Sequence, residues 1–461
     1  MNLVNRTILF FPVHQSAAKE MAVVARGAQE AGAKVVFWAR LPETRSCLLG
    51  EGVDQRDIFS PSKEDGSAGN TKKISWSSVL KQQFAKTCLG RWLWVLRARS
   101  EKQFESRVQA ELRVLEREYV ELSELFDSVA PDVVAVSSDR GKWDELSALQ
   151  LCREKSLSSI IIPYAIAADK LTMPLVRRGP TYDADAFPLI RDAYNHMVAE
   201  NCHTGKKCLF YAPWIIVALD RVGLLPEKPW VLGGGNSDWI LVDGKIAKDR
   251  LIAHGCHPDK IRITGMASYD SLYKSSLRKK KVRRSIVETC GFDASRKLAI
   301  FAVPSFYEQN VKDWEDNYLF LQRVLQAFKA ADFNVLLSLH PRMKEEEYRF
   351  MVSEGFALAN QSLSEILSAA DLFVTTVSST AMWAPLLGIP QVVLNDVGLP
   401  DDYYRQLPGA FFDEASDVEE LSRIMRKALS VSSEIFLEGK GGGVQFDGRS
   451  TERIVKLLME L

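Results

Sequence analysis

The sequence has no excess of either charge, few cysteines and no long apolar run. Its 59 Lys and Arg residues balance 59 Asp and Glu residues. The resulting formal net charge of zero argues against a dedicated nucleic-acid-binding protein, because such proteins normally carry a basic excess. The seven cysteines are scattered and odd in number, without CxxC spacing. This pattern is typical of free thiols in a reducing cytoplasm rather than of a disulfide framework.

Membrane-spanning and secretory signals are also missing. The longest apolar stretch, near 208–219, is far shorter than the ~20 residues that a spanning helix needs. At the N-terminus one Arg precedes a short apolar run, and no small-residue cleavage site follows. We therefore expect a cytoplasmic protein, with any membrane contact peripheral on the inner face of the membrane.

Metal ligands at a familiar spacing are absent as well. Cys202, His203 and Cys208 lie close together, but their spacing matches no common zinc site. We predict that they are structural residues and that the protein holds no metal.

The sequence does contain the composition and the patterns of a multidomain α/β protein. Its 461 residues predict two or three domains at ~150 residues each. Apolar runs of strand length alternate with helical patterns in both halves, which predicts two domains with mainly parallel sheets. A helix is also expected over 188–201. The main predicted strands are 7–13, 34–39, 132–138, 159–164, 238–244, 260–265, 297–304, 333–340, 372–379 and 390–395.

Polar residues follow three predicted strands of the second half, which is where ligands bind in open α/β sheets. Ser305 follows the first strand, His340-Pro341-Arg342 the next, and Ser378-Ser379-Thr380 a third. The three hydroxyl residues stand at the predicted start of a helix, whose N–H groups suit a phosphate. They equally fit an ordinary N-cap without a ligand.

His340 and Arg342 each have two interpretations. The imidazole of His340 either donates to, or protonates, a phosphate oxygen, or it lies at the edge of the core and is satisfied by the backbone. Arg342 either pairs with a diphosphate or is a solvated surface charge. Taken together with the serines, these residues predict a phosphate site without metal, since His, Arg and the helix dipole supply positive charge.

Longer segments resemble the GT-B-fold glycosyltransferases, a class of two Rossmann-type domains. DLFVTTVSSTAMWAPLLGIPQVVLN (371–395) resembles their donor phosphate loop and following helix. Residues 244–273 resemble the end of their N-terminal domain, and FDGRSTERIV (446–455) their C-terminal return helix. The pairs His340-Pro341 and Ser378-Ser379 are similar to the HP and SS motifs of bacterial sialyltransferases and related Kdo transferases, which use CMP-activated sugars.

The resemblance implies a domain plan and a donor site. It implies an α/β, GT-B-like fold with two Rossmann-type domains facing a central cleft, and no cofactor besides the nucleotide-sugar donor. The domains would be an acceptor domain at 1–272, a linker at 273–296, a nucleotide-sugar domain at 297–447 and a helix at 448–461 returning toward the first domain. The implied donor-binding residues are Ser305, His340, Pro341, Arg342, Glu365, Ser378, Ser379 and Thr380.

The sequence departs from relatives of this class at the residue that binds the ribose. Many members, including UDP-GlcNAc 2-epimerases, carry a Glu near the start of the helix after the serine loop, where this chain has Trp383. A Trp does not accept two hydrogen bonds from ribose hydroxyls. Glu365 is the alternative ribose ligand, unless it is a solvated first-turn Glu favoured by the helix dipole. Pro385 predicts that the helix is short or kinked.

The first half is expected to hold the acceptor and the catalytic base. Asp139 follows a strand and, facing a cleft, would deprotonate an acceptor hydroxyl; otherwise it caps the next helix or pairs with Arg140. His14, after the first strand, is a second candidate for the catalytic group. Gly233-Gly234-Gly235-Asn236 is either a backbone nest that approaches a ligand or a loop that needs positive φ.

Two basic stretches stand out within the neutral total. Residues 84–102 combine arginines with tryptophans, which suits either a membrane interface or a helix packed into its domain. The charge run at 278–284 is either a solvated connector helix or a contact with anionic lipid headgroups.

The sequence thus predicts a metal-independent glycosyltransferase that moves a sugar from a nucleotide-activated donor, with a CMP-linked sialic or Kdo-type sugar favoured. Its acceptor would be a surface polysaccharide or a lipid-linked glycan, as in capsule or lipopolysaccharide synthesis. Three rivals stay open: a UDP-GlcNAc 2-epimerase-like enzyme, a CDP-linked polyol-phosphate transferase, and a non-catalytic glycan-binding protein.

Overall fold

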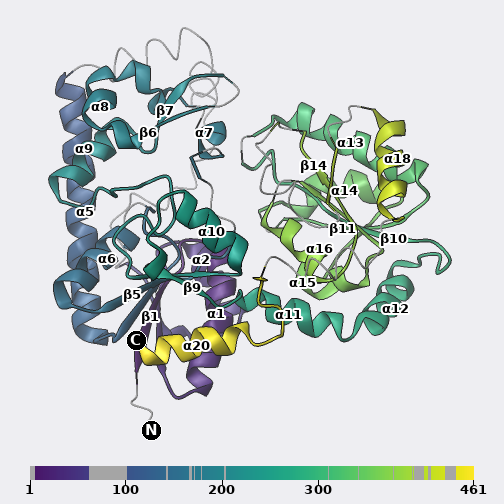
Figure 1. Ribbon diagram of the computed structural model, residues 1–461, viewed down its shortest axis with the longest axis horizontal. Helices are drawn as coiled ribbons and strands as arrows, with labels where there is room; N and C mark the ends of the chain where they lie inside the picture. The colour runs from purple at the N-terminus through teal and green to yellow at the C-terminus, as the bar shows by residue number, and fades with distance from the viewer. Residues whose placement is uncertain are drawn as a thin grey trace. The chain divides into compact units, whose positions relative to one another are not determined.

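The computed structural model divides the chain into two compact units, each described here by itself (Figure 1). The first unit comprises Met1–Val242, Ala247–Arg262 and Ile454–Leu461, and the second comprises Asp243–Ile246 and Ile263–Arg453. The structure describes residues 6–61, 101–141, 144–165, 169–170, 172–177, 179–201, 204–309, 311–340, 342–376, 378–396, 398, 410–413, 417–430 and 443–461.

A parallel sheet forms the centre of the first unit. Strands buried on both faces need continuous apolar sequence, as in the fully buried Val133–Val136. The strand order is β3-β2-β1-β4-β5-β8-β9, and the pairings from β3 to β8 are parallel. The strands are β1 (Thr7–Phe11), β2 (Lys34–Trp38), β3 (Ile58–Phe59), β4 (Val133–Val136), β5 (Ser158–Ile161), β8 (Trp239–Val242) and β9 (Ile261–Ile263).

Helices connect these strands and cover the sheet. The buried face of α1 is made mostly of alanines, so this helix approaches the sheet closely. The long α5 packs against α6 and extends beyond the sheet (Figure 1). The helices are α1 (Gln15–Glu30), α2 (Pro42–Gly50), η1 (Gln55–Asp57), α5 (Glu101–Val129), α6 (Asp144–Lys155), α10 (Lys245–Ala253) and η5 (Pro258–Lys260).

An insertion of short elements lies between β5 and β8. It packs on the far part of α5, where Val108 and Leu115 share a buried cluster with Leu209 and Ile216 (Figure 1). Its elements are α7 (Met173–Val176), η2 (Pro180–Tyr182), η3 (Ala184–Ala186), α8 (Pro188–Ala193), η4 (Asn195–Met197), β6 (Val198–Glu200), β7 (Lys207–Leu209) and α9 (Pro213–Arg221).

The helix predicted over 188–201 is wrong in its second half. The helix α8 ends at Ala193, and β6 pairs antiparallel with β7. Met197 and Ala199 are buried while Glu200 is exposed. This alternation with a period of two residues fits a strand rather than a helix.

The second unit is built on another parallel sheet. Its strand order is β12-β11-β10-β13-β14-β15, and every pairing is parallel. The predicted strands of the second half are therefore confirmed. The strands are β10 (Leu298–Ala302), β11 (Asn334–Ser338), β12 (Ala357–Leu358), β13 (Leu372–Thr376), β14 (Gln391–Leu394) and β15 (Ala410–Asp413).

Helices cover both faces of this second sheet. Alternate residues of β10 enter different clusters: Phe301 packs with residues of α13, α14 and α18, whereas Ile300 packs with residues of α11, α12, α15 and α16. The helices are α11 (Ala267–Ser276), α12 (Lys279–Cys290), α13 (Trp314–Ala330), α14 (Glu345–Ser353), α15 (Leu363–Ile366), η6 (Leu367–Ala369), η7 (Ser379–Met382), α16 (Trp383–Leu386) and α18 (Val418–Ala428). The last helix, α20 (Ser450–Glu460), begins in the second unit and ends in the first.

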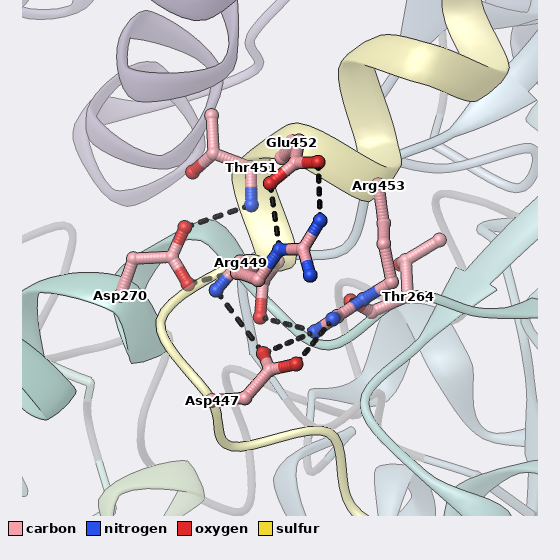
Figure 2. A network of polar contacts seen from close by, with 8 residues as sticks. Thr264, Asp270, Asp447, Arg449, Thr451, Glu452 and Arg453 are labelled. Carbon is pink, nitrogen blue, oxygen red and sulfur yellow. Dashed lines mark hydrogen bonds and ion pairs between the residues drawn. The ribbon is translucent and has the colours of Figure 1, made fainter.

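The start of α20 is held by a network of polar contacts (Figure 2). The carboxylate of Asp270 accepts hydrogen bonds from the backbone N–H groups of Ser450 and Thr451, each at 2.8 Å. Arg453 donates to the backbone oxygen of Thr264 at 2.8 Å and also pairs with Asp447. A residue 180 positions upstream thus caps this helix and satisfies N–H groups that a helix leaves unpaired.

The unit boundaries differ from the predicted domains. Residues 273–296, predicted as a linker, belong to the second unit, because Ile286 is buried in one of its cores and Val282 packs against that core. The second unit also begins earlier than 297, because it includes Asp243–Ile246 and runs on from Ile263, and the boundary near the C-terminus falls inside α20, after Arg453. Within the described ranges, no helix is long and apolar enough to cross a membrane.

Candidate functional site

A cavity of about 580 Å³ lies in the first unit, at the carboxyl ends of the central strands. Phe11 ends β1, Ser137 and Ser138 follow β4, and all three line the cavity. The chain winds outward in opposite directions from β1 and β4, because β2 and β3 lie on one side and β5 and β8 on the other. The cavity thus occupies the topological switch point, where open α/β sheets bind their ligands.

The insertion supplies the opposite wall of this cavity. Arg177, Tyr182, Phe210 and Tyr211 come from its short elements and loops. The elements of this insertion are too short to show a clear periodicity in the sequence.

Glu145 contributes a buried carboxylate to the residues that line the cavity. It lies in the first turn of α6 and is 1% exposed. Its Oε1 accepts three hydrogen bonds: from the backbone N–H groups of Ser137 and Ser138, each at 2.8 Å, and from the Ser137 hydroxyl at 2.7 Å. Its Oε2 has no hydrogen-bond partner among the described residues. Burial raises the pKa of Glu145 to about 8, although its hydrogen bonds act in the opposite direction.

Gly141 makes room for this carboxylate. A Cβ built at Gly141 would lie 2.2 Å from Oε2 of Glu145, which no real side chain permits. Gly141 and Glu145 both line the cavity. The absence of a side chain at Gly141 therefore leaves the space that the buried Oε2 of Glu145 occupies.

Three arginines line the cavity, and the charge of one of them, Arg40, is balanced by neighbouring acids. Arg40 is paired with Asp144, with contacts of 2.6–2.9 Å. Arg140 is almost fully buried and donates to the backbone oxygen of Pro229 at 3.1 Å, and burial lowers its pKa. Arg177 stacks 4.7 Å from the centre of the Tyr182 ring, and its Nε is buried without a hydrogen-bond partner in the described part of the chain. Such guanidinium groups suit an anionic ligand.

Asp139 does not have the geometry expected of the predicted base. It is fully buried and does not line the cavity. Its carboxylate accepts hydrogen bonds from the backbone N–H groups of Gly233 and Gly235, at 3.1 and 2.6 Å. Burial raises the pKa of Asp139. A base that faces a cleft is therefore not found at this position, because the side chain points into the glycine loop instead.

The glycine loop, Gly233–Gly235, binds the carboxylate of Asp139 through its backbone N–H groups. A Cβ at Gly235 would lie 2.6 Å from the backbone oxygen of Asp139, so the close approach requires glycine. Gly233 has φ of +83°, the left-handed conformation that glycine favours. Both features expected of the loop are present, and they serve to bind Asp139.

His14, the second predicted catalytic residue, begins α1. Its Nδ1 accepts the backbone N–H of Ser16 at 3.2 Å. Its ring meets that of Tyr164 edge-on at 4.3 Å, and Tyr164 lines the cavity. His14 therefore contacts a residue that lines the cavity but does not line it itself.

The predicted donor site lies at the carboxyl edge of the second sheet. Ser305 follows β10, His340 follows β11 and Ser378 follows β13, and the strand order β11-β10-β13 places Ser305 between the other two. The sheet reverses its winding between β10 and β13, so this edge is again a switch point. The structure thus places these predicted residues along one edge of one sheet.

His340 and Arg342 sit in a turn after β11. The backbone N–H of Arg342 donates to Nδ1 of His340 at 3.2 Å, which places the proton of a neutral ring on Nε2. Arg342 is exposed and has no ion pair among the residues described. Ser305 is buried and accepts a hydrogen bond from the amide of Gln309 at 2.7 Å.

The serine loop forms the N-cap of a short helical segment. The Ser378 hydroxyl accepts the backbone N–H of Thr380 at 3.1 Å and lies 2.7 Å from the Thr380 hydroxyl. Ser379 begins η7, which leads into the four-residue α16. The short helix expected from Pro385 is therefore confirmed. Trp383 is the first residue of α16 and packs, partly buried, against the core cluster that also contains Ile286 of α12.

Glu365 forms a capping box at the start of α15. Its Oε2 accepts hydrogen bonds from the backbone N–H and the hydroxyl of Ser362, at 3.0 and 2.7 Å. This is a local structural role close to the helix-dipole alternative considered from the sequence. Its predicted part in binding ribose stays a prediction.

Some predicted features lie outside the described residues. These are Pro341, the Cys202–His203 pair and nearly all of the basic-aromatic stretch 84–102. Within the part of the chain that the structure describes, no group of three or more His, Cys, Asp or Glu residues is arranged to hold a metal ion.

The second half of the chain matches the model of a known protein family. Residues 245–460, just under half of the chain, match the family model of CDP-glycerol:poly(glycerophosphate) glycerophosphotransferases. The match covers almost all of the second unit. No curated protein sequence matches the chain.

Solved structures with the same fold cover the whole chain at low identity. The UDP-GlcNAc 2-epimerase of Neisseria meningitidis, bound to UDP-GlcNAc, has a TM-score of 0.54 and 13% identity, covering 99% of this chain and 100% of its own. The spinosyn rhamnosyltransferase SpnG, complexed with thymidine diphosphate, has a TM-score of 0.53 and 14% identity, with coverages of 98% and 99%. A putative UDP-N-acetylglucosamine 2-epimerase of Listeria monocytogenes gives 0.53 and 13%, with 98% and 95%.

These similarities define the class of the protein. The two units with parallel sheets form an α/β fold of the GT-B type, as predicted. The match of residues 245–460 to a transferase family model indicates a transferase enzyme, on a fold of the GT-B type.

Proposed function

We propose that this protein transfers a polyol phosphate from a CDP-linked donor to a hydroxyl acceptor. The observation that carries the proposal is the match of residues 245–460 to a glycerophosphotransferase family model. That family's described donor is CDP-glycerol, and the matched residues include the whole predicted donor edge, from Ser305 to Thr380.

The proposed reaction makes one demand on the donor site. The acceptor oxygen attacks the phosphorus of the polyol phosphate, and the bond from that phosphorus to the bridging oxygen of the diphosphate breaks. CMP leaves with the electron pair, and the acceptor proton goes to a base. The donor site must therefore stabilise negative charge on the phosphate of departing CMP.

The residues at the carboxyl edge of the second sheet fit this demand. His340 would donate from Nε2 to a phosphate oxygen, because its Nδ1 already accepts the Arg342 N–H. Ser378 and Thr380 would add hydroxyl donors, and the exposed Arg342 would pair with the diphosphate. These groups supply positive charge and donors without a metal ion.

The cavity of the first unit fits the acceptor. Glu145 would take the proton of the acceptor hydroxyl at Oε2, because three donors fix Oε1 and leave Oε2 unpartnered. A general base is most effective when its pKa lies near the operating pH. The pKa of Glu145, raised to about 8, is closer to neutral pH than that of an ordinary glutamate. Arg140 and Arg177 would bind an anionic group of the acceptor. Glu145 thus replaces Asp139 as the proposed base.

A second candidate is transfer of a sugar from a CMP-linked donor. The sequence pairs His340-Pro341 and Ser378-Ser379 support it through their similarity to the HP and SS motifs, and His340 and Ser378 follow strands of one sheet. Here the acceptor oxygen attacks the anomeric carbon and the leaving group is again CMP. Both candidates therefore expect a CMP site on the second unit. An epimerase is less favoured because Trp383 replaces the ribose-binding Glu.

The first test is binding of nucleotides to the whole protein. CMP and CDP should raise the melting temperature more than UDP or thymidine diphosphate, and Ser378→Ala should reduce the shift. Release of CMP from CDP-glycerol, but not from CMP-sialic acid or CMP-Kdo, would support the first candidate. The reverse preference would establish the second. Conversion of UDP-GlcNAc without an acceptor, or the lack of any nucleotide effect, would overturn both.

A further inference from the structure

An unpaired basic surface surrounds the start of α12. Residues 274–284 carry seven Lys and Arg side chains and no acid. Of these, Arg283 pairs with Asp371 and donates to the backbone oxygen of Ala369, which anchors the helix. The other six are exposed and form no ion pair among the described residues; they are Lys274, Arg278, Lys279, Lys280, Lys281 and Arg284.

The position of these charges disfavours the helix that bears them. Lys279, Lys280 and Lys281 occupy the first turn of α12, which has no acidic residue and no side-chain cap. The N-terminus of a helix already carries partial positive charge, so cations there are unfavourable. These charges destabilise the first turn of α12 and no ion pair among the described residues offsets this. Such a segment is more readily explained by a function than by the stability of the fold.

An apolar side chain stands within this surface. Leu277, between α11 and α12, is 71% exposed, among the most exposed large apolar side chains of the described residues. Lys274 precedes it by three residues, and Arg278 follows it directly. The opposite side of α12 is tied to the second unit by Val282 and Ile286, so the basic side faces away from the core.

We propose that this surface, made of Leu277 and the six unpaired cations, binds an anionic lipid bilayer. The cations are complementary to acidic headgroups, and Leu277 can reach the boundary of the acyl chains. A nucleic acid or a soluble polyphosphate would use the charges but gain nothing from an exposed leucine. This inference does not depend on which donor the enzyme uses.

The test measures partition of the whole protein to sedimented vesicles. Binding is expected to phosphatidylcholine vesicles containing phosphatidylglycerol and not to phosphatidylcholine alone, and it should weaken at high salt. Each cation near an anionic surface contributes about a fivefold factor, so Lys279→Gln/Lys280→Gln should lower the partition coefficient by about 25-fold. The fold should survive, because the change removes unfavourable first-turn charge.

Two further variants separate a lipid site from general charge attraction. The matched control Lys206→Gln/Lys207→Gln removes two exposed lysines from the insertion and should leave binding unchanged. Leu277→Ser should weaken vesicle binding at least several-fold without changing binding to a DNA duplex. The proposal is overturned if the α12 variant and the control behave alike, if neutral vesicles bind equally well, or if Leu277→Ser has no effect on vesicles.

Discussion

Two buried carboxylates of the first unit, Glu145 and Asp139, differ in how many of their oxygens accept hydrogen bonds. The two oxygens of Glu145 have different surroundings: Oε1 accepts three hydrogen bonds and Oε2 accepts none among the described residues. Asp139 illustrates the opposite case, because both of its oxygens are bound by the glycine loop. The first arrangement suits proton transfer, and the second suits fixing a loop.

At this scale we predict that Glu145→Gln lowers transferase activity by about 10²–10⁴-fold, the range of a lost general base. In the unaltered enzyme, activity should rise with pH and level off above about 8, as the raised pKa implies. That rising limb should disappear in the variant. Steady-state rates measured from pH 5.5 to 9.5, a range chosen to bracket the roughly 8 expected for this carboxyl, give the profile.

The matched control is Glu154→Gln, the same change at an exposed site of the same helix, where the carboxylate contacts Tyr119 and Gln150. It should leave the profile intact. Equal losses in both variants, or an unchanged limb in Glu145→Gln, would refute the assigned role.

The sequence could predict the strands but not the identity of this residue. β1, β4 and β10 are continuous apolar runs because both of their faces are buried, so they are visible without any knowledge of the fold. An acid in the first turn of a helix, such as Glu145, looks the same in sequence whether it is solvated or buried. The contact of Gly235 with Asp139 spans 96 positions, and no local pattern records it.

At the scale of elements, two N-caps in the second unit differ in their expected function. Ser378 begins the segment after β13 at the proposed donor edge, whereas Ser362 forms the capping box of α15. We predict that Ser378→Ala lowers kcat/KM by about 10- to 100-fold, the range for one hydrogen bond to a charged group. Ser362→Ala should reduce stability by about 1 kcal/mol with activity per folded molecule unchanged.

The measurement is steady-state kinetics with the accepted donor, together with thermal melting of both variants. Activity that falls equally in the two variants would show that the serine at 378 matters only for the fold.

A second prediction at this scale concerns α20, which is capped by a distant acid (Figure 2). Asp270→Ala removes the acceptor for the N–H groups of Ser450 and Thr451 and should cost about 1–2 kcal/mol, as lost N-caps do. Glu452→Ala removes only an exposed ion pair with Arg449 and should cost at most ~0.5 kcal/mol. Denaturant unfolding of the two variants gives the comparison, and similar costs would argue against the capping role.

At the scale of the whole molecule, buried acids set the pH dependence of stability. Burial raises the pKa of both Glu118 and Glu145 to about 8. The folded protein therefore holds these protons more tightly than the unfolded chain, so their contribution falls as pH rises from about 4.5 toward 8 and then levels off. We predict a melting temperature that declines over this range.

The double variant Glu118→Gln/Glu145→Gln should flatten this decline. The control Glu105→Gln/Glu452→Gln removes two exposed acids, whose pKa values arginine partners lower, and should keep it. Melting curves from pH 5 to 8.5, which brackets the roughly 4.5-to-8 window set by the two raised pKa values, decide between them. A decline that persists in the double variant would assign the effect to other groups.

The division of α20 between the units has a consequence for the order of synthesis. Ile454–Leu461 cluster with the first unit, and Ile454 and Leu458 are fully buried, yet the ribosome makes them after the entire second unit. The first unit, although most of it is synthesised first, is therefore completed only when the last residues of the chain are made. A nascent chain arrested before Ile454 would carry a complete second unit and a first unit with an uncovered apolar surface, so chaperones should bind mainly to the first unit.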